Sequence, residues 1–457
     1  MAVLPNAFKI QMQNLLGKEV DSFFSELETS SPISIRYNPN KNADLPIEHE
    51  KVQWASAAFY LKQRPLFTAD PLFHAGAYYV QEASSMFLEQ ALIQHCSLNK
   101  KNRILDLCAA PGGKSTLIAG LMNPECLLLS NEVIRSRAHI LSENIQKWGN
   151  ENVWVSNNDP SYLAHSLPAF FDVIVVDAPC SGEGMFRKSA DSIDEWSEQA
   201  VNHCSLRQQR ILHDIWGALR PGGILIYSTC TYNEYENELN LIKFKESCEF
   251  DSLRIKLDNS WKVSETQKNE VYGYRFYPHL TKGEGFFLSV LKKAGDKEAS
   301  DPKIKKNILT KAGKEADFLK NYCLNPTLEF FKRKELILAV SKSLSYEAQL
   351  IESSLNIVSG GAQLAELNRK GFVPNPAAAL WTGLNKEAFS VTELNLEDSL
   401  RYLHLENLNT ELTNAKEGWQ LVTYKGLGLG WIKRLSNRVN NYYPKEWRIR
   451  MSLDKLF

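Results

Sequence analysis

The sequence predicts an α/β protein built on a doubly wound parallel sheet, with a small N-terminal α+β extension and a β-rich C-terminal domain. Residues 173–176 form an unbroken Val/Ile run that ends at Asp177. Such a run is typical of a parallel strand that helices cover on both faces. Residues 103–156 alternate strand, helix, strand, helix and strand, which is the order of a doubly wound sheet. A further strand at residues 223–228 also ends in a polar turn.

Composition excludes few classes of protein. The chain has 457 residues, which suits two or three domains, and its 53 basic and 53 acidic residues point to no partner. It has no apolar run of about 18 residues and no charged start followed by an apolar core, so we expect neither a membrane span nor a signal peptide. None of its eight cysteines belongs to a Cys-x-x-Cys pair. This pattern argues against a metal site and favours a cytoplasmic protein with reduced thiols.

The N-terminal region reads as mixed α and β structure. Residues 8–27 are amphipathic and predict helices, whereas residues 33–37 alternate as a short strand. Residues 74–86 lead into a helix for which Ser84 or Ser85 is the expected N-cap.

A glycine-rich turn after the first strand of the sheet is a candidate cofactor site. The turn CAAPGGKS, residues 108–115, follows the strand 104–107 and opens a helix whose N-terminus can approach a ligand closely. Its end matches the Walker A motif, but Cys108 replaces the first glycine of that motif, and the turn is not G-x-G-x-x-G either. The turn therefore favours a nucleoside-bearing cofactor over a triphosphate.

Two acidic residues at later strand ends extend this candidate site. Glu132 ends the strand within residues 126–133 and comes about 20 positions after the glycine-rich turn. A carboxylate at that spacing commonly accepts the ribose hydroxyls of a nucleoside. Asp159 follows the strand 153–156 and is a further strand-end carboxylate.

Two cysteines follow two strands of the same predicted sheet. Pro179 stiffens the turn between Asp177 and Cys180, and Cys230 follows the strand 223–228 in the same setting. A single buried cysteine is more often inert than reactive. Two thiols at strand ends beside a carboxylate instead indicate a catalytic site.

The rest of the chain predicts a long helix at 196–219, two edge strands within 271–291, a linker that begins at residue 292, and a basic C-terminal unit. From residue 416 onward, nine basic residues stand against three acidic ones, with aromatic residues between them. Basic side chains for phosphates beside aromatic faces for bases suit RNA binding, although a β-barrel core with a charged rim would share this composition. The candidate RNA contacts are Trp431, Lys433, Arg434, Arg438 and Tyr442.

Three motifs resemble those of the Sun-type RNA cytosine-C5 methyltransferases, namely CAAPGGKS at 108–115, DAPCSGEG at 177–184 and STCTYNEYENE at 228–238. The resemblance extends over most of the chain. Residues 34–41, 74–86 and 273–287 are similar to flanking segments of that family. Residues 418–433 and 437–444 are similar to the PUA-like domain of its bacterial RsmF branch, which modifies small-subunit ribosomal RNA.

The resemblance implies a Rossmann-like class I methyltransferase sheet, a C-terminal PUA-like domain and S-adenosylmethionine as the cofactor. It implies that Cys230 adds to C6 of a cytosine, that Cys180 helps to remove the C5 proton and release the product, and that Asp177 holds the base edge and supports protonation at N3. The implied cofactor contacts are Cys108, Ala109, Ala110, Pro111, Gly112, Gly113 and Lys114, with Glu132 on the ribose, Asp159 near the adenine and Asp177 at the methionine end.

The expected domains are an N-terminal RNA-binding extension (1–102), a methyltransferase domain (103–291), a linker (292–317), a mixed α/β segment (318–373) and the PUA-like domain (374–457). The expected function is the formation of 5-methylcytosine in 16S ribosomal RNA by a cytoplasmic enzyme without a metal or a membrane partner, with a monomer favoured. Two alternatives remain open: a P-loop-like ATPase, suggested by the end of the glycine-rich turn, and a non-catalytic RNA-binding factor in ribosome assembly.

Overall fold

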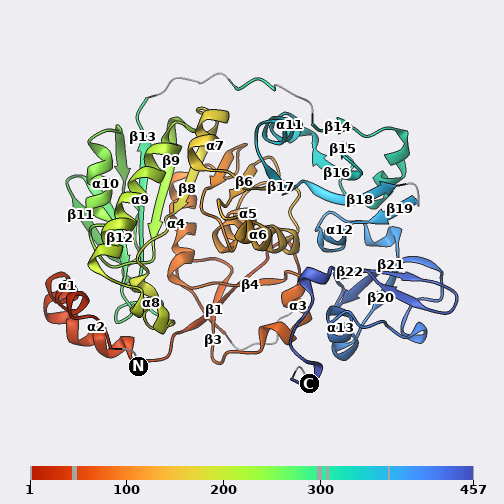
Figure 1. Ribbon diagram of the computed structural model, residues 1–457, viewed down its shortest axis with the longest axis horizontal. Helices are drawn as coiled ribbons and strands as arrows, with labels where there is room; N and C mark the ends of the chain where they lie inside the picture. Colours follow the sequence, from red (N-terminus) through yellow and green to blue (C-terminus); the bar gives the residue numbers. More distant parts are fainter. Residues whose placement is uncertain (1–2, 44–48, 296–300, 305–307, 369–370, 456–457) are drawn as a thin grey trace.

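The centre of the molecule is a sheet of ten strands, seen in a computed structural model that describes residues 3–43, 49–295, 301–304, 308–368 and 371–455 (Figure 1). Five strands are parallel and lie in the order β7-β6-β5-β8-β9. Their order along the chain reverses between β5 and β8, which confirms the predicted doubly wound sheet. The bounds are β5 (Arg103–Asp106), β6 (Leu127–Asn131), β7 (Val153–Ser156), β8 (Phe171–Asp177) and β9 (Leu219–Thr229).

Antiparallel strands extend the sheet at both edges. Beyond β9 the order continues β13-β12-β11, β10 also pairs with β13, and β17 is antiparallel to β7 at the other edge. The bounds are β10 (Phe250–Leu253), β11 (Ser264–Lys268), β12 (Val271–Phe276), β13 (Phe286–Lys293) and β17 (Ile357–Gly360). The prediction of two edge strands within residues 271–291 is wrong, because β13 lies inside the sheet and β12 has a neighbour on each side.

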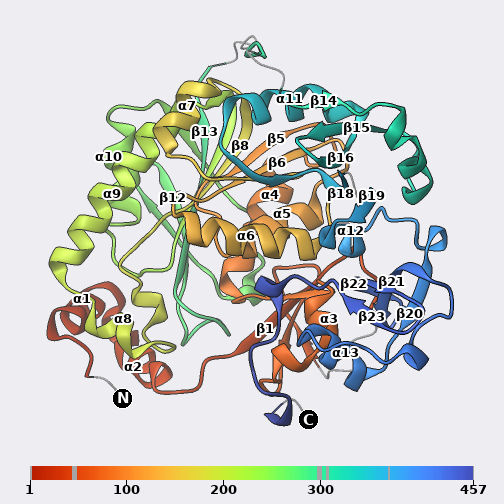
Figure 2. The same ribbon diagram turned by 45° about the vertical axis from the view of Figure 1, so that its right-hand side comes forward.

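Helices cover both faces of the sheet and divide its core in two (Figures 1 and 2). Val173 and Val175 of β8 pack in one core, and Ile174 and Val176 pack in the other. Because both faces are buried, residues 173–176 of the strand are all apolar, as the sequence predicted. One face carries α4 (Leu88–His95), α5 (Gly113–Leu121) and α6 (Arg135–Trp148), and the other carries α7 (Pro160–Ser166), α9 (Glu198–Trp216), α10 (Glu238–Lys245) and α11 (Ser345–Ser354).

The N-terminal region forms a helix pair and a small antiparallel sheet of order β2-β3-β1-β4. The helix pair packs around Phe8 and Phe23 against Phe186, Trp196 and Tyr232, which lie close to the two cysteine-bearing turns. The bounds are α1 (Asn6–Leu16), α2 (Val20–Leu27), α3 (Pro71–His74), α8 (Ala190–Asp194), β1 (Ile33–Tyr37), β2 (His49–Lys51), β3 (Ala58–Leu61) and β4 (Tyr78–Val80).

The predicted serine cap in this region is wrong. Neither Ser84 nor Ser85 caps α4, which is preceded by a 3₁₀ turn at Ser84–Phe87. The carboxylate of Glu82 accepts the backbone N–H groups of both serines at 2.9 Å instead. A carboxylate has two oxygens for two donors, whereas each hydroxyl here donates to a backbone oxygen.

Two smaller sheets make up the C-terminal part. The first has the order β14-β15-β16-β18-β19 and the second the order β20-β21-β22-β23. In Figure 1 the second sheet lies at the opposite end of the molecule from α1 and α2. The bounds are β14 (Thr310–Lys311), β15 (Leu328–Arg333), β16 (Leu336–Ser341), β18 (Ala362–Asn368), β19 (Gly371–Pro374), β20 (Ser390–Glu393), β21 (Gly418–Tyr424), β22 (Leu427–Arg434), β23 (Val439–Asn441), α12 (Pro376–Leu380) and α13 (Leu396–Leu403).

Two of the expected divisions of the chain contribute to these sheets. The segment 292–317 holds the end of β13 and the whole of β14, and its residues 296–300 and 305–307 lie outside the described residues. The segment 318–373 supplies β17 to the central sheet as well as strands of the first small sheet. Within the described part of the chain, no helix has the length and apolar character needed to cross a membrane.

Candidate active site

The two predicted cysteines meet at the carboxyl ends of neighbouring strands. β8 and β9 pair in parallel up to Asp177 and Ser228, so the turns that follow them leave the sheet side by side. The sulfur atoms of Cys180 and Cys230 lie 3.0 Å apart, and the Cys230 N–H donates to the Cys180 sulfur at 3.3 Å. Both thiols are free.

A glycine allows this close approach. The N–H of Gly184 donates to the backbone oxygen of Cys230 at 2.9 Å. A Cβ atom on Gly184 would lie 2.4 Å from the backbone oxygen of Gly285 and 2.9 Å from that of Cys230. Any larger residue at this position would therefore push the two cysteine-bearing turns apart.

The surroundings of Cys180 favour its protonated form. The hydrogen bond with Cys230 and the burial of the thiol raise the pKa of Cys180 well above its usual range, and nearby Glu236 raises it further. Cys180 therefore retains its proton next to the sulfur of Cys230.

Asp177 holds an ion pair beside the thiols. Its Oδ2 atom accepts from Nζ of Lys114 at 2.8 Å, and its Oδ1 atom accepts from the Ser228 hydroxyl at 2.8 Å. Burial lowers the pKa of Lys114, but the charges of Asp177 and Asp106 outweigh it and raise that pKa overall. Lys114 therefore stays charged, and the glycine-rich turn is connected to the end of β8.

Two cavities, of about 250 and about 370 Å³, meet at this point. The smaller is lined by Glu132, Asp159 and the Cys180 turn, and the larger by the glycine-rich turn, Tyr79 and Phe286. Their shared lining residues are Cys108, Ala110, Asp177 and Cys230. Cys230 thus borders two adjoining spaces, as a transfer between two bound molecules requires.

Buried carboxylates at two strand ends border the two cavities, Glu132 the smaller one and Asp106 the larger one. Glu132 is buried just after β6, and its Oε2 atom lies 3.5 Å from Nη1 of Arg137. Its Oε1 atom accepts the Ile134 N–H. Asp106 at the end of β5 lines the larger cavity instead, and one of its carboxylate oxygens has no hydrogen-bond partner among the described residues. A buried carboxylate oxygen that no protein group satisfies suits an ammonium or hydroxyl group of a ligand.

The structure separates some of the predicted cofactor residues from the others. Ala109, Pro111, Gly113 and Lys114 line the larger cavity only. Gly112 lines neither cavity, because it faces Leu141 of α6. Its φ of +119° favours glycine, so this residue shapes the turn and does not contact the cofactor. Asp159 is exposed and caps α7 through the N–H of Ser161, while still lining the smaller cavity.

Sequence reasoning missed Asp106. It ends a buried strand just as Asp177 does, and that repeated pattern was the available signal. Its Oδ2 atom accepts the Ser115 hydroxyl at 2.6 Å. Burial raises its pKa to about 7, although the bond from Ser115 opposes the shift.

The C-terminal residues predicted to contact RNA fall into two groups. Trp431 is 1% exposed and its indole N–H donates to the backbone oxygen of Asn375, so it cannot stack on a base and the prediction is wrong for this residue. Its position in β22 turns it into the core between the sheet and α12. Tyr442 is 39% exposed and contacts Trp419, over whose ring the Lys433 ammonium lies at 5.3 Å. Arg438 is exposed, and Arg434 is half-buried.

Three family models match successive parts of the chain. Residues 4–83 match the N-terminal domain of 16S rRNA methyltransferase RsmF, residues 94–292 match the 16S rRNA methyltransferase RsmB/F model, and residues 389–449 match the methyltransferase RsmF PUA domain.

Curated proteins and a solved structure resemble the chain over much of its length. Ribosomal RNA small subunit methyltransferase F of Vibrio atlanticus is 30% identical and the match covers 97% of each chain. The protein of the same name from Aeromonas salmonicida is 32% identical over 87% of this chain and 85% of its own. The crystal structure of a methyltransferase homolog from Pyrococcus horikoshii is 27% identical with a TM-score of 0.53, and the match covers 63% of this chain and 95% of that one.

Proposed function

The chain belongs to the RsmF family of 16S rRNA methyltransferases, and from this premise we propose that it methylates C5 of a cytosine through a transient bond between Cys230 and C6 of the base. The enzyme depends on S-adenosylmethionine. The observation that carries the proposal is the thiol pair at 3.0 Å, where two cavities meet beside the Asp177–Lys114 ion pair.

Carbon 5 of cytosine needs activation because it is a weak nucleophile. Addition of the Cys230 thiolate to C6 forms the S–C6 bond and moves the electrons of the C5–C6 double bond toward C5 and the ring nitrogens. Asp177, on the shared border of the two cavities, would hold the base edge and support protonation at N3. When bound, S-adenosylmethionine supplies an electrophilic methyl group for the activated C5.

The second thiol would complete the reaction. The proton on C5 must leave, the C5–C6 double bond must return, and the S–C6 bond must break so that Cys230 leaves as a thiolate. The pKa of Cys180 is raised chiefly by its contact with Cys230. Because the S–C6 bond removes the charge on Cys230, Cys180 can release its proton to water at that stage and, as a thiolate, accept the C5 proton.

The larger cavity would receive the target base and the smaller one the cofactor. On this assignment Cys108 and Ala110 still border the cofactor, whereas Ala109, Pro111, Gly113 and Lys114 would face the base instead. Lys114, Tyr79 and Phe286 line the larger cavity, while Glu132 and Asp159 would contact the ribose and the adenine in the smaller one. A cytosine has to leave its stack before a sulfur can reach C6. Tyr442, Lys433, Arg434 and Arg438 are the proposed RNA contacts of the C-terminal domain. We infer that the enzyme acts in the cytoplasm on small-subunit RNA, as its family membership suggests.

Two cysteine variants test the chemistry. Cys230→Ala should abolish methylation, whereas Cys180→Ala should let a covalent protein–RNA adduct accumulate as a band that survives denaturing electrophoresis. Cys204→Ala is the matched control, because Cys204 is a free, half-buried thiol on α9 and belongs to neither turn. Bisulfite sequencing of ribosomal RNA reads the modified base. If the two variants exchanged behaviours, the assignment of the two thiols would be wrong.

Of the two alternatives, a P-loop ATPase no longer agrees with the family to which the chain belongs. An RNA-binding assembly factor with an idle site remains testable. It would be supported if cells that carry Cys230→Ala kept normal ribosome assembly while changes at Lys433, Arg434 and Arg438 disrupted it.

A further inference from the structure

Two buried carboxylates connect the loops that carry the thiols. The Cys180 loop comprises residues 178–184 and the Cys230 loop comprises residues 230–237. We propose that Glu183 and Glu236 are positioning residues that hold the sulfurs of Cys180 and Cys230 at the separation on which the thiol chemistry depends. The proposal rests on the proposed function for its catalytic consequence, while the geometry itself can be measured without catalysis.

The first carboxylate reaches from the Cys180 loop to the Cys230 loop. The Oε2 atom of Glu183 accepts the backbone N–H groups of Tyr232 at 2.8 Å and of Asn233 at 2.9 Å. Its Oε1 atom accepts from the indole of Trp196 at 3.0 Å and from Gln11 of α1 at 3.1 Å. One side chain therefore fixes two successive peptides of the opposite loop.

The second carboxylate reaches in the reverse direction. The Oε2 atom of Glu236 accepts the backbone N–H of Ser181 at 3.0 Å, and its Oε1 atom accepts the Ser181 hydroxyl. Ser181 directly follows Cys180, so this bond fixes the peptide next to the thiol. Gln208 of α9 donates to Glu236 at 2.7 Å and to the backbone oxygen of Pro179 at 3.1 Å, which holds the same loop on its other side.

Asn233 joins the two carboxylates. Its amide nitrogen lies 3.1 Å from Oε1 of Glu183 and 2.7 Å from Oε1 of Glu236. Both carboxylates have no exposed surface, and none of the ion pairs among the described residues includes either of them. Burying a charge without a cation is unfavourable unless hydrogen bonds satisfy it. The N–H and amide groups of the two loops supply these hydrogen bonds, so the two carboxylates hold the loops together.

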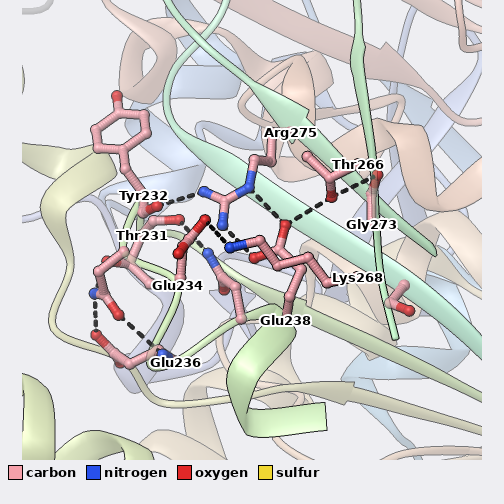
Figure 3. A network of polar contacts seen from close by, with 12 residues as sticks. Thr231, Tyr232, Glu234, Glu236, Glu238, Thr266, Lys268, Gly273 and Arg275 are labelled. Carbon is pink, nitrogen blue, oxygen red and sulfur yellow. Dashed lines mark hydrogen bonds and ion pairs between the residues drawn. The ribbon is translucent and has the colours of Figure 1, made fainter. Parts of the chain in front are cut away.

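Two neighbouring carboxylates, Glu238 and Glu234, contact β11 and β12 instead. Figure 3 shows Arg275 reaching from β12 to Glu238 and to the backbone oxygen of Tyr232. Glu234 lies in the same picture and pairs with Lys268 at 2.5 Å. These contacts anchor the Cys230 segment to β11 and β12, and neither carboxylate contacts the Cys180 loop. Only Glu183 and Glu236 connect the two loops through carboxylates among the described contacts.

The test measures the affinity of an arsenical, which reports whether the sulfurs of Cys180 and Cys230 lie close together. Phenylarsine oxide combines with two thiols to form two As–S bonds and one water molecule, and it binds tightly only where two sulfurs lie close together. We would measure its affinity in Glu183→Gln and Glu236→Gln, with Cys180→Ala as the single-thiol baseline. Glu234→Gln is the control, since it removes a carboxylate charge from the Cys230 loop without removing a bond to the Cys180 loop. Single-turnover methylation of ribosomal RNA is measured on the same proteins.

The expected result is a loss of about ten-fold or more in both arsenical affinity and single-turnover rate for the two carboxylate variants, because each loses charge-assisted hydrogen bonds. Glu234→Gln should stay within about two-fold of the unchanged protein. Ser181→Ala removes only the hydroxyl that donates to Glu236 and should therefore lower the arsenical affinity by a smaller factor. This variant tests the proposal if either glutamine variant does not fold.

Wild-type arsenical affinity in Glu183→Gln and Glu236→Gln would overturn the proposal, and so would slow methylation without a change in that affinity. In the Ser181→Ala variant, unchanged affinity would overturn it as well. The proposed function is judged separately. If Cys230→Ala still methylated RNA, the covalent chemistry would be wrong, while the arsenical measurement would still decide whether the two carboxylates set the spacing.

Discussion

Replacement of Asp177 by Asn tests whether the charge at the end of β8 takes part in the reaction. Asn has almost the same shape as Asp, and its oxygen can still accept the Ser228 hydroxyl that now lies 2.8 Å from Oδ1. Its amide nitrogen would face the ammonium of Lys114, 2.8 Å from the present Oδ2 atom. The substitution thus removes one charge and one hydrogen bond and leaves the packing of the strand in place.

The structure sets the expected loss of stability. The side chain of Lys114 is 11% exposed and that of Asp177 is 36% exposed. Breaking a fully buried pair costs about 3–5 kcal/mol and breaking an exposed pair about 0–1 kcal/mol. For this half-screened pair we expect about 1–2 kcal/mol, a small part of the roughly 5–15 kcal/mol that stabilises a folded domain. The protein should therefore remain folded.

The expected loss of activity is much larger. Removing a general acid or base typically slows a reaction by about 10²–10⁴-fold, so we expect the single-turnover methylation rate of Asp177→Asn to fall by about 100-fold or more. Urea unfolding of the same sample measures the change in stability.

Asp172 offers a matched control at the opposite end of the same strand. It pairs with Arg220 and accepts the Arg103 N–H at 2.6 Å. Burial raises the pKa of Asp172, so the loss of this charge should cost little free energy of unfolding. Asp172→Asn should also leave the methylation rate nearly unchanged. If Asp177→Asn methylated RNA at the normal rate, or if both variants lost activity in proportion to their stability, the role proposed for Asp177 would be refuted.

Two further expectations concern a buried acid and the RNA surface. Burial raises the pKa of Asp106 from 3.8 to about 7, so the folded protein holds a proton that the unfolded chain releases. The stability from this proton is present below pH 4 and is lost as the pH rises to about 7. Asp106→Asn should therefore gain stability relative to the unchanged protein across that interval in urea unfolding, and a pH-independent difference would contradict this reasoning. Lys433→Ala should weaken RNA binding and reduce the slope of log affinity against log salt by about 1. An unchanged salt slope in a filter-binding titration would place Lys433 away from the phosphates.

The pattern of apolar residues determined the central sheet, because the middle of a strand that helices cover on both faces has to be apolar on both faces. Val173 to Val176 show this directly, since alternate residues enter the two cores. The carboxyl ends of parallel strands lie at one edge of a sheet, so the sequence also indicated that Asp177 and Cys230 are neighbours. The resemblance to the Sun-type family supplied the chemistry that the spacing alone left open.

Tertiary packing decided features that a local pattern cannot carry. Trp431 is an aromatic residue among basic ones, which predicted an RNA contact. Its side chain is buried because the strand face it occupies packs on α12. The Ser84 hydroxyl donates to the backbone oxygen of Glu284, 200 positions away, while Glu82 close by in the sequence accepts the N–H groups of both serines.

The distance between the two sulfurs is another feature that tertiary packing decided. Local sequence placed Cys180 and Cys230 after their strands, because apolar runs and turn residues act over a few positions. The 3.0 Å between them depends on Gly184, Glu183 and Glu236, whose contacts cross from one loop to the other over about fifty positions of the chain. Contacts of that range are made only when the chain is folded, so only the tertiary structure could show them.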